Sequence, residues 1–233
     1  KYPFMNGYWK DKIPNFAKVT IPVYQTAGMS HFHLMGSVKA FRLCKSRQKW
    51  LRIHRDFEWP DTYTPENLED LKRFYDRYLK DIHNGWEMTP KVRVDVMDAY
   101  EDDYCTIRAE TSFPLERTEY RKYYFDASKH VGGDVYEMSE TPVATESSVS
   151  YDGKTGQVEF DLQFKEDTEL TGYMKVHMFV EADGHDDMDL FINVQKADAD
   201  GNWIPWFTLD EPHPGAWGKC RVSRRELDEK LST

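Results

Sequence analysis

The hydrophobic periodicity of this chain changes at Pro90, and that change constrains the fold more than any other feature of the sequence. Before Pro90, apolar residues come in short continuous runs and at spacings of three and four; after it, they mostly alternate with polar residues. The first pattern is typical of strands covered on both faces and of amphipathic helices. The second is typical of strands with one buried face. We therefore predict an α/β part followed by an all-β part, with the boundary between Trp86 and Lys91.

Two strands and two helices are predicted before that boundary. The run KVTIPVYQTAG, residues 18–28, is rich in β-branched and aromatic residues and ends in glycine, which predicts a strand. Apolar spacing predicts a helix over 33–44, and KWLRI predicts a second strand. In the second helix Thr64 is a suitable cap and Pro65 a suitable first residue, and Gly85 is the expected C-cap. The order strand, helix, strand, helix is typical of a parallel α/β sheet.

Period-two alternation predicts the strands of the second part. The alternating apolar residues are Val92, Val94 and Val96; Val158, Phe160, Leu162 and Phe164; Met174, Val176, Met178 and Val180; and Leu190, Ile192 and Val194. Turn signals such as YDGKTG and DADGN separate these runs. The pattern predicts an antiparallel sandwich of short strands.

Composition excludes several classes of protein. A chain of 233 residues with 39% hydrophobic and 31% charged residues can bury a core, and is neither a disordered tail nor a membrane protein. A net charge of −10 without a clustered basic patch argues against nucleic acid and anionic membrane surfaces as partners. No apolar run reaches the roughly 18 residues of a membrane span, and the first residues lack the apolar stretch of a signal peptide.

The cysteines indicate neither a disulfide framework nor a zinc knuckle. There are three, they lie far apart, and none forms a Cys-x-x-Cys pair. Reduced thiols are the expectation, which leans toward a cytoplasmic location.

His54 is the first candidate for chemistry because it ends the predicted strand KWLRI. In open parallel sheets, ligands gather beyond the carboxyl ends of strands, and Ser30, His31 and His33 follow the other predicted strand. A histidine that acts as general base needs a nucleophile and an acid, whereas a packed ring needs neither. Ser30 has the strand-turn-helix setting of a nucleophile elbow. However, Phe32 stands where Gly-x-Ser-x-Gly has its second glycine, so a turn or capping serine is the competing interpretation.

Two segments carry residue types that bind metals. His31, His33 and His54 could form a three-histidine site with an open position, although a turn after Gly28 would not point the first two the same way. The acidic run DGHDDMD, residues 183–189, contains calcium-type ligands but lacks the EF-hand order. Capping roles for the histidines and a solvated loop for the acidic run are the competing interpretations.

A group of aromatic residues near the C-terminus could form a platform for sugars or peptides. Its members are Trp203, Trp206, Phe207 and Trp217. Packing in the core or at the rim of a sandwich is the competing interpretation.

Four segments resemble the cocaine-esterase-like serine hydrolases, the CocE/NonD family that also contains the X-Pro dipeptidyl-peptidases. They are KWLRIHRDFEWPDTY, FYDRYLKDIHNGWEMTPKVRVDVMD, LTGYMKVHMFVEADGHDDMDLFINV and RVSRRELD. The resemblance covers nearly the whole chain. It implies that residues 1–86 are the C-terminal segment of an α/β-hydrolase domain. It also implies that residues 87–233 are a jelly-roll β-sandwich, similar to galactose-binding domains and incomplete at its C-terminus.

The resemblance also implies roles for individual residues. The family uses a triad of serine, aspartate and histidine in that chain order. His54 falls at the histidine position, which makes it the expected general base. AGMSH stands where the family has a motif of the kind Ala-Gly-Trp-Tyr-Asp, so His31 replaces the aspartate. A histidine cannot hold the imidazole tautomer as a carboxylate does, and Asp56, Glu58 and Asp61 are the nearby acids that could substitute.

The nucleophilic serine and oxyanion hole of the family correspond to sequence upstream of residue 1. We therefore expect an excerpt of a larger protein, completed by the rest of the polypeptide or by a partner chain. The implied function is hydrolysis of a small ester, amide or peptide, including X-Pro dipeptide bonds, through an acyl-enzyme, without cofactor or metal. The alternative is a catalytically inactive relative that serves as a ligand-binding or scaffold module.

Overall fold

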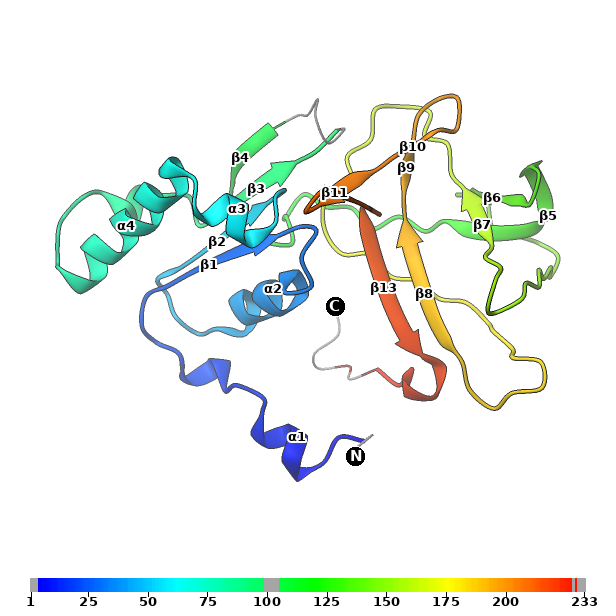
Figure 1. Ribbon diagram of the computed structural model, residues 1–233, viewed down its shortest axis with the longest axis horizontal. Helices are drawn as coiled ribbons and strands as arrows, with labels where there is room; N and C mark the ends of the chain where they lie inside the picture. Colours follow the sequence, from blue (N-terminus) through cyan, green and yellow to red (C-terminus); the bar gives the residue numbers. More distant parts are fainter. Residues whose placement is uncertain (1–3, 99–104, 228, 230–233) are drawn as a thin grey trace. The chain divides into compact units, whose positions relative to one another are not determined.

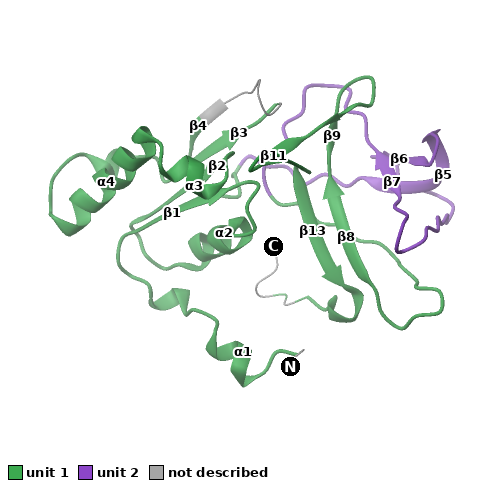
Figure 2. Ribbon diagram, in the orientation of Figure 1, with its two compact units in different colours: residues 1–116, 173–233 green, residues 117–172 purple. Residues whose placement is uncertain are grey.

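The structure is a computed structural model that describes residues 4–98, 105–227 and 229 (Figure 1). It divides into two compact units, Lys1–Glu116 with Tyr173–Thr233, and Arg117–Gly172 (Figure 2). The helices are α1 (Gly7–Asp11), α2 (Leu34–Leu43), α3 (Glu58–Thr62) and α4 (Pro65–Leu79), with 3-10 turns η1 (Phe16–Lys18), η2 (Trp86–Met88) and η3 (Val222–Arg224).

A four-stranded mixed sheet organises the first unit. Its strands are β1 (Val23–Gly28), β2 (Lys49–His54), β3 (Val92–Val96) and β4 (Cys105–Glu110), in that spatial order. β1 and β2 are parallel, and so are β2 and β3, whereas β4 runs antiparallel to β3. The predicted parallel arrangement of the first two strands is confirmed. The parallel register places Gly28 opposite His54, so both strands end at the same edge of the sheet.

The two faces of this sheet bury different groups. On one face Leu51, Val92 and Val94 pack against Val38 and Phe41 of α2, which lies beside β1 and β2 in Figure 1. The other face carries a second cluster, formed by Trp50, Phe74 of α4 and Trp86. Because side chains alternate along a strand, His54 shares this second face with Trp50.

The helix predictions are confirmed except at one end. The side chain of Thr64 accepts a hydrogen bond from Asn67 N–H at 3.4 Å, and Pro65 is the first residue of α4. Gly85 does not cap α4. The helix stops at Leu79, the chain turns through Asp81 with φ 54°, and Gly85 instead precedes η2. The left-handed Asp81 takes the place after the helix that glycine was expected to fill.

The strand β3 differs from its prediction in its pairing. Its period of two was expected to mark the start of the antiparallel part, yet β3 is parallel to β2. The alternating polar residues Arg93 and Asp95 are also buried. Alternation here reflects a second buried face rather than a face in water: Arg93 pairs with Asp70, and Asp95 accepts the backbone N–H groups of Arg55 and Ile107.

The remaining strands are short and lie in small separate sheets. In the first unit they are β8 (Asp189–Val194), β9 (Lys196–Ala197), β10 (Trp203–Ile204), β11 (Trp206–Thr208), β12 (Glu211–His213) and β13 (Ala216–Arg221). They pair antiparallel as β13 with β8, β10 with β9 and β11 with β12. The second unit holds β5 (Tyr124–Gly132), β6 (Val135–Ser139) and β7 (Glu159–Asp161), with β6 and β7 parallel.

Three strand predictions fail wholly or in part. The first strand begins at Val23 rather than at residue 18, and the run over 158–164 forms only the three residues of β7. The alternating segment 174–180 forms no strand, since its backbone pairs with no strand in the part of the chain that the structure describes. Alternation predicts which face a strand would bury, but a ladder also needs a neighbouring strand.

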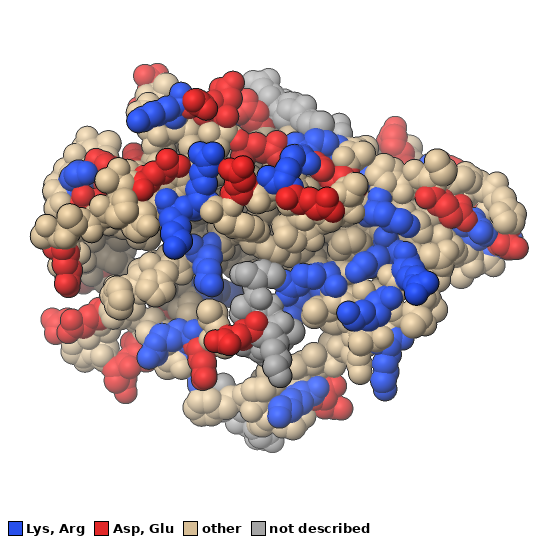
Figure 3. Space-filling model, turned by 180° about the vertical axis from the view of Figure 1, so that it is seen from behind, with Lys and Arg blue, Asp and Glu red and all other residues tan. Residues whose placement is uncertain are grey.

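Acidic and basic side chains are interspersed over much of the face drawn in Figure 3. Charged side chains of the described residues also form ion pairs: Arg77 Nη1 lies 2.7 Å from Asp81 Oδ1, and Arg221 holds Asp189 through two nitrogens at 2.8 and 2.7 Å. Among the described residues no helix is long and apolar enough to cross a bilayer. Cys44 and Cys220 are free thiols, and the side chain of Cys105 lies outside what the structure describes.

Candidate active site

His54 is buried at the C-terminal end of β2, with 1% of its surface exposed. Neither ring nitrogen has a hydrogen-bond partner among the described residues. After His54 the chain turns and enters the short helix α3. This turn brings the acids of the segment DFEWPD back toward the edge where β1 and β2 end.

Asp61 is the acid that reaches His54. Its Oδ1 lies 3.3 Å from His54 Nδ1, although the ring is not aligned for a hydrogen bond. Both side chains are buried. Asp61 also forms a two-pronged ion pair with Arg52, in which Nη1 donates to Oδ1 at 2.8 Å and Nη2 donates to Oδ2. Arg52 precedes His54 by two residues on β2 and therefore points to the same face of the sheet.

A buried network of charges continues from Arg52 across the sheet. The hydroxyl of Tyr24 accepts from Arg52 Nε at 3.2 Å and from Arg93 Nη2 at 2.8 Å, and it donates to Asp70 at 2.5 Å. Arg93 also holds Asp70 through both terminal nitrogens, at 3.0 and 2.9 Å. Burial raises the pKa of Tyr24 to about 12, so the hydroxyl stays neutral. Paired in this way, the two arginines fix the position of the acid beside His54.

Burial lowers the pKa of His54 from 6.5 to about 4. The Asp61 carboxylate opposes this shift, and the nearby Arg52 guanidinium adds to it. At neutral pH the imidazole is therefore uncharged. An uncharged imidazole is the form that can accept a proton.

The depressed pKa of His54 predicts a pH dependence of stability. The folded chain binds a proton on His54 only near pH 4, whereas the unfolded chain binds one near pH 6.5. The contribution of His54 to the free energy of unfolding should therefore be complete above pH 6.5, and the free energy of unfolding should fall by about 3 kcal/mol as the pH drops to 4. Urea titrations across this range measure it. His54→Gln should flatten the slope, and an unchanged slope would contradict the shift.

His31 pairs with Glu58 and not with His54. It lies 3% exposed in the turn after β1, with Nδ1 3.0 Å from Glu58 Oε1. The same nitrogen accepts the backbone N–H of His33 at 3.1 Å, and the ring stacks on Phe32 with centroids 4.1 Å apart. Burial lowers the pKa of His31, and the adjacent Glu58 opposes that shift.

The chain is similar to proteins of a known hydrolase family. Residues 84–232 match the family described as X-Pro dipeptidyl-peptidase C-terminal non-catalytic domain. The chain belongs to the CocE/NonD X-Pro dipeptidyl-peptidase-like family. Two crystal structures of a CocE/NonD family hydrolase from Staphylococcus aureus are similar over 100% of this chain, with TM-scores of 0.87 and identities of 31% and 30%. This chain spans 42% of those chains. None of the curated proteins matches it.

Gly28 is required where the two strands of this CocE/NonD chain end together. A Cβ atom at Gly28 would lie 2.6 Å from the Asp56 carbonyl oxygen and 3.3 Å from His54 Cε1. Gly28→Ala should therefore destabilise the fold by about 1–3 kcal/mol, as overpacking does. Gly36→Ala is the matched control, because nothing lies within 4 Å of its Cβ position in α2. Urea unfolding should show that control to be stabilised by about 0.5–1 kcal/mol.

The other residues that the sequence suggested for catalysis or metal binding lie apart from the pair of His54 and Asp61, or have partners of their own. Ser30 lies in the turn after β1, and its buried Oγ has no partner among the described residues. Asp56 pairs with Arg55 at 3.6 Å. In the acidic run, Asp187 accepts from Ser223 N–H and Oγ–H at 2.9 and 2.8 Å, so protein donors occupy its carboxylate.

The candidate aromatic platform is divided among three small sheets. Trp203 lies on β10, Trp206 and Phe207 on β11, and Trp217 on β13.

Sequence reasoning missed the partnership of Asp61 with Arg52. The signal was present, since Arg52 lies two residues before the candidate base on a strand of the predicted parallel α/β sheet, and such sheets are normally covered on both faces. A charged residue at such a position requires a buried counter-ion.

Proposed function

We propose that this chain is the C-terminal portion of a serine hydrolase that cleaves ester or amide bonds, including X-Pro dipeptide bonds, through an acyl-enzyme. His54 is the general base, and Asp61 is the acid that orients it in place of the acid lost at His31. The serine nucleophile comes from sequence outside this chain. In the reaction His54 takes the serine proton as the Oγ–carbonyl bond forms, and then returns a proton to the leaving group.

The observation that carries this proposal is the position of Asp61 Oδ1, 3.3 Å from His54 Nδ1. The ring is not aligned for a hydrogen bond, but a carboxylate this close to Nδ1 favours the tautomer with its proton on that nitrogen. That tautomer leaves a lone pair on Nε2, which has no partner among the described residues. The contact between acid and base and the unpaired Nε2 support the proposed triad.

The division into an α/β-hydrolase segment, 1–86, and a jelly-roll sandwich, 87–233, belongs to the same proposal, with β3 and β4 at the junction, where they extend the sheet of β1 and β2. Apolar side chains left exposed in the all-β part support it. Phe179 is 96% exposed and Phe191 on β8 is 74% exposed. These two are among many large apolar residues that are exposed in this part of the chain. Large apolar patches are normally covered, and further strands of a larger sandwich would cover them.

Labelling by a fluorophosphonate tests the proposal. The full natural protein is incubated with the probe, and its intact mass is compared with that of a sample unfolded before the probe is added. One label per chain on the native protein alone is expected, because only a serine activated by its base reacts. If the native protein takes no label, hydrolysis is wrong, and the scaffold or ligand-binding alternative replaces it.

A further inference from the structure

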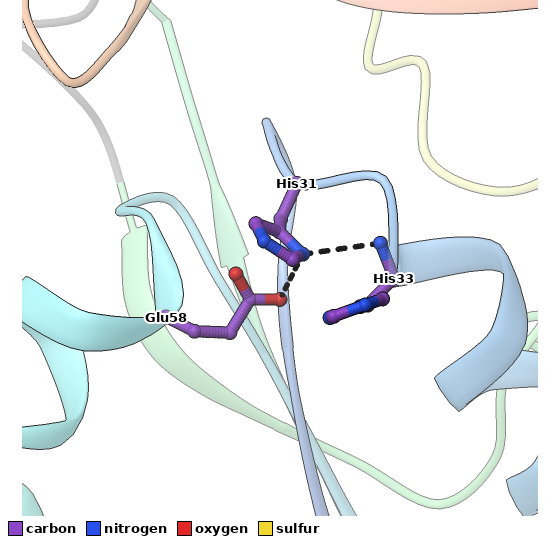
Figure 4. A group of neighbouring side chains, drawn as sticks. All are labelled: His31, His33 and Glu58. Atoms are coloured by element: carbon purple, nitrogen blue, oxygen red, sulfur yellow. Dashed lines mark hydrogen bonds and ion pairs between the residues drawn. The ribbon is translucent and has the colours of Figure 1, made fainter.

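His31 and Glu58 present lone pairs to one another. His31 Nδ1 accepts the His33 backbone N–H at 3.1 Å, so it carries a lone pair rather than a proton. The Glu58 carboxylate oxygen Oε1 nevertheless lies 3.0 Å from that nitrogen (Figure 4). Two acceptors at this distance repel unless a positive charge lies between or beside them.

Two further buried atoms of the pair lack a hydrogen-bond partner among the described residues. Glu58 Oε2 is an acceptor without a donor. His31 Nε2 carries the ring proton when Nδ1 carries the lone pair, so it is a donor without an acceptor. The ring of His33 lies beside the other two in Figure 4, at the start of α2, and His33 is exposed. One ligand atom from each of the three residues lies within 4.8 Å of the other two. Glu58 Oε2 has no donor, and Glu58 Oε1 faces the lone pair of His31 Nδ1. Such a buried arrangement of acceptors is costly, which indicates a missing positive group.

A proton is the simplest positive group, but this site does not favour one. A proton on His31 Nδ1, in the neutral ring or in the imidazolium, would let that nitrogen donate to Glu58 Oε1, but it would remove the hydrogen bond from His33 N–H. Burial also lowers the pKa of His31, which disfavours the imidazolium. A metal cation bound by all three residues accepts the lone pairs of neutral imidazoles, so neither histidine needs to carry a positive charge.

We propose that His31, His33 and Glu58 bind a divalent first-row transition-metal ion, of which Zn²⁺ fits best. Two imidazoles and one carboxylate are a ligand set that Zn²⁺ takes readily, with a fourth position open to water. Ligand atoms around tetrahedral Zn²⁺ lie about 3.4 Å apart. His31 Nδ1 and Glu58 Oε1 are 3.0 Å apart and need to separate slightly, and the His33 ring needs to approach them. Rotation of the exposed His33 ring supplies that movement. The ion would replace the His33 N–H as the partner of the His31 lone pair.

This site differs from the three-histidine arrangement considered from sequence. Asp61 Oδ1 lies 3.3 Å from His54 Nδ1, and Glu58 rather than His54 lies beside His31 and His33. The site does not depend on the proposed hydrolase function.

Metal binding by the full natural protein tests the inference. Zn²⁺ affinity is measured by competition with a chromophoric chelator, and Co²⁺ reports the coordination geometry through its visible absorbance. One ion per chain is expected, with the intense bands of tetrahedral Co²⁺. Affinity should fall roughly 10–100-fold or more in His33→Gln and in Glu58→Gln, the range seen even for residues that only support a metal ligand. His33 is exposed, so its variant should fold.

Two matched variants complete the experiment. His83→Gln removes an exposed histidine outside the site and should bind the ion as the parent does. His54→Gln should bind it too. The inference is overturned by the absence of saturable uptake, by uptake that survives both His33→Gln and Glu58→Gln, or by uptake lost in His54→Gln and retained in Glu58→Gln.

Discussion

Turnover by the full natural protein is expected to fall at least roughly 10⁴-fold when His54 is replaced by glutamine. Glutamine fills a similar volume but cannot accept the proton of a serine nucleophile. His54 is the residue through which the nucleophile and Asp61 would be linked, so its loss disables the whole arrangement. Single-turnover acylation of a chromogenic ester measures the effect directly, because it isolates the step in which the proton moves.

A control separates this role from general damage to the fold. His83→Gln also removes one imidazole, from an exposed position, and should leave acylation unchanged. Unfolding by urea shows whether the His54 variant keeps its structure. Acylation at the parental rate in a folded His54→Gln protein would exclude His54 as the base.

Asp61→Asn is expected to reduce turnover roughly 10³- to 10⁴-fold, because an amide neither fixes the Nδ1–H tautomer of His54 nor balances the imidazolium. The same substitution leaves Arg52 buried beside a neutral partner. Breaking one side of a buried ion pair costs about 3–5 kcal/mol, so the variant should also unfold at lower urea concentration. The activity is therefore measured well below the unfolding transition.

The pH profile of kcat/KM distinguishes a loss of His54 orientation in Asp61→Asn from a loss of folding stability. The Asp61 carboxylate holds the pKa of His54 up, and Arg52 holds it down. Without the carboxylate the acid limb of kcat/KM should move to lower pH, a change that loss of stability alone would not produce. Asp56→Asn, which removes a neighbouring half-exposed acid, is the matched control and should change neither the rate nor the limb. An Asp61→Asn enzyme with the parental profile would show that another group orients His54.

Local signals in the sequence were sufficient for α2 and for the start of α4, but they did not predict α3, the short helix that carries Glu58 and Asp61. Thr64 and Pro65 define the start of α4 because a cap and a first helical residue act on the adjacent backbone alone. Gly28 ends β1 as expected. Its reason became visible only in the fold, where the Asp56 carbonyl leaves no room for a side chain.

The sequence placed His54 at the end of a strand and surrounded it with three acids, but it could not choose among them. The positions along the chain of Asp56, Glu58 and Asp61 are almost equivalent, and their spatial positions depend on the turn into α3. In the structure Glu58 faces His31 and Asp61 faces His54. That choice is a consequence of how a short turn folds back over the sheet edge.

Apolar periodicity and the order of elements along the chain predicted α2, most of α4, the parallel pair β1 and β2, and the position of His54. Periodicity failed for the alternating segment 174–180, which forms no strand among the described residues. Tertiary structure alone decided the rest. β3 joined the parallel sheet because Arg93 found Asp70 and Tyr24 on its second face. Asp61 became the partner of His54 because Arg52 holds it there. The counter-ion of a buried charge lies in another segment of the chain, so only the folded structure shows which acid pairs with which arginine.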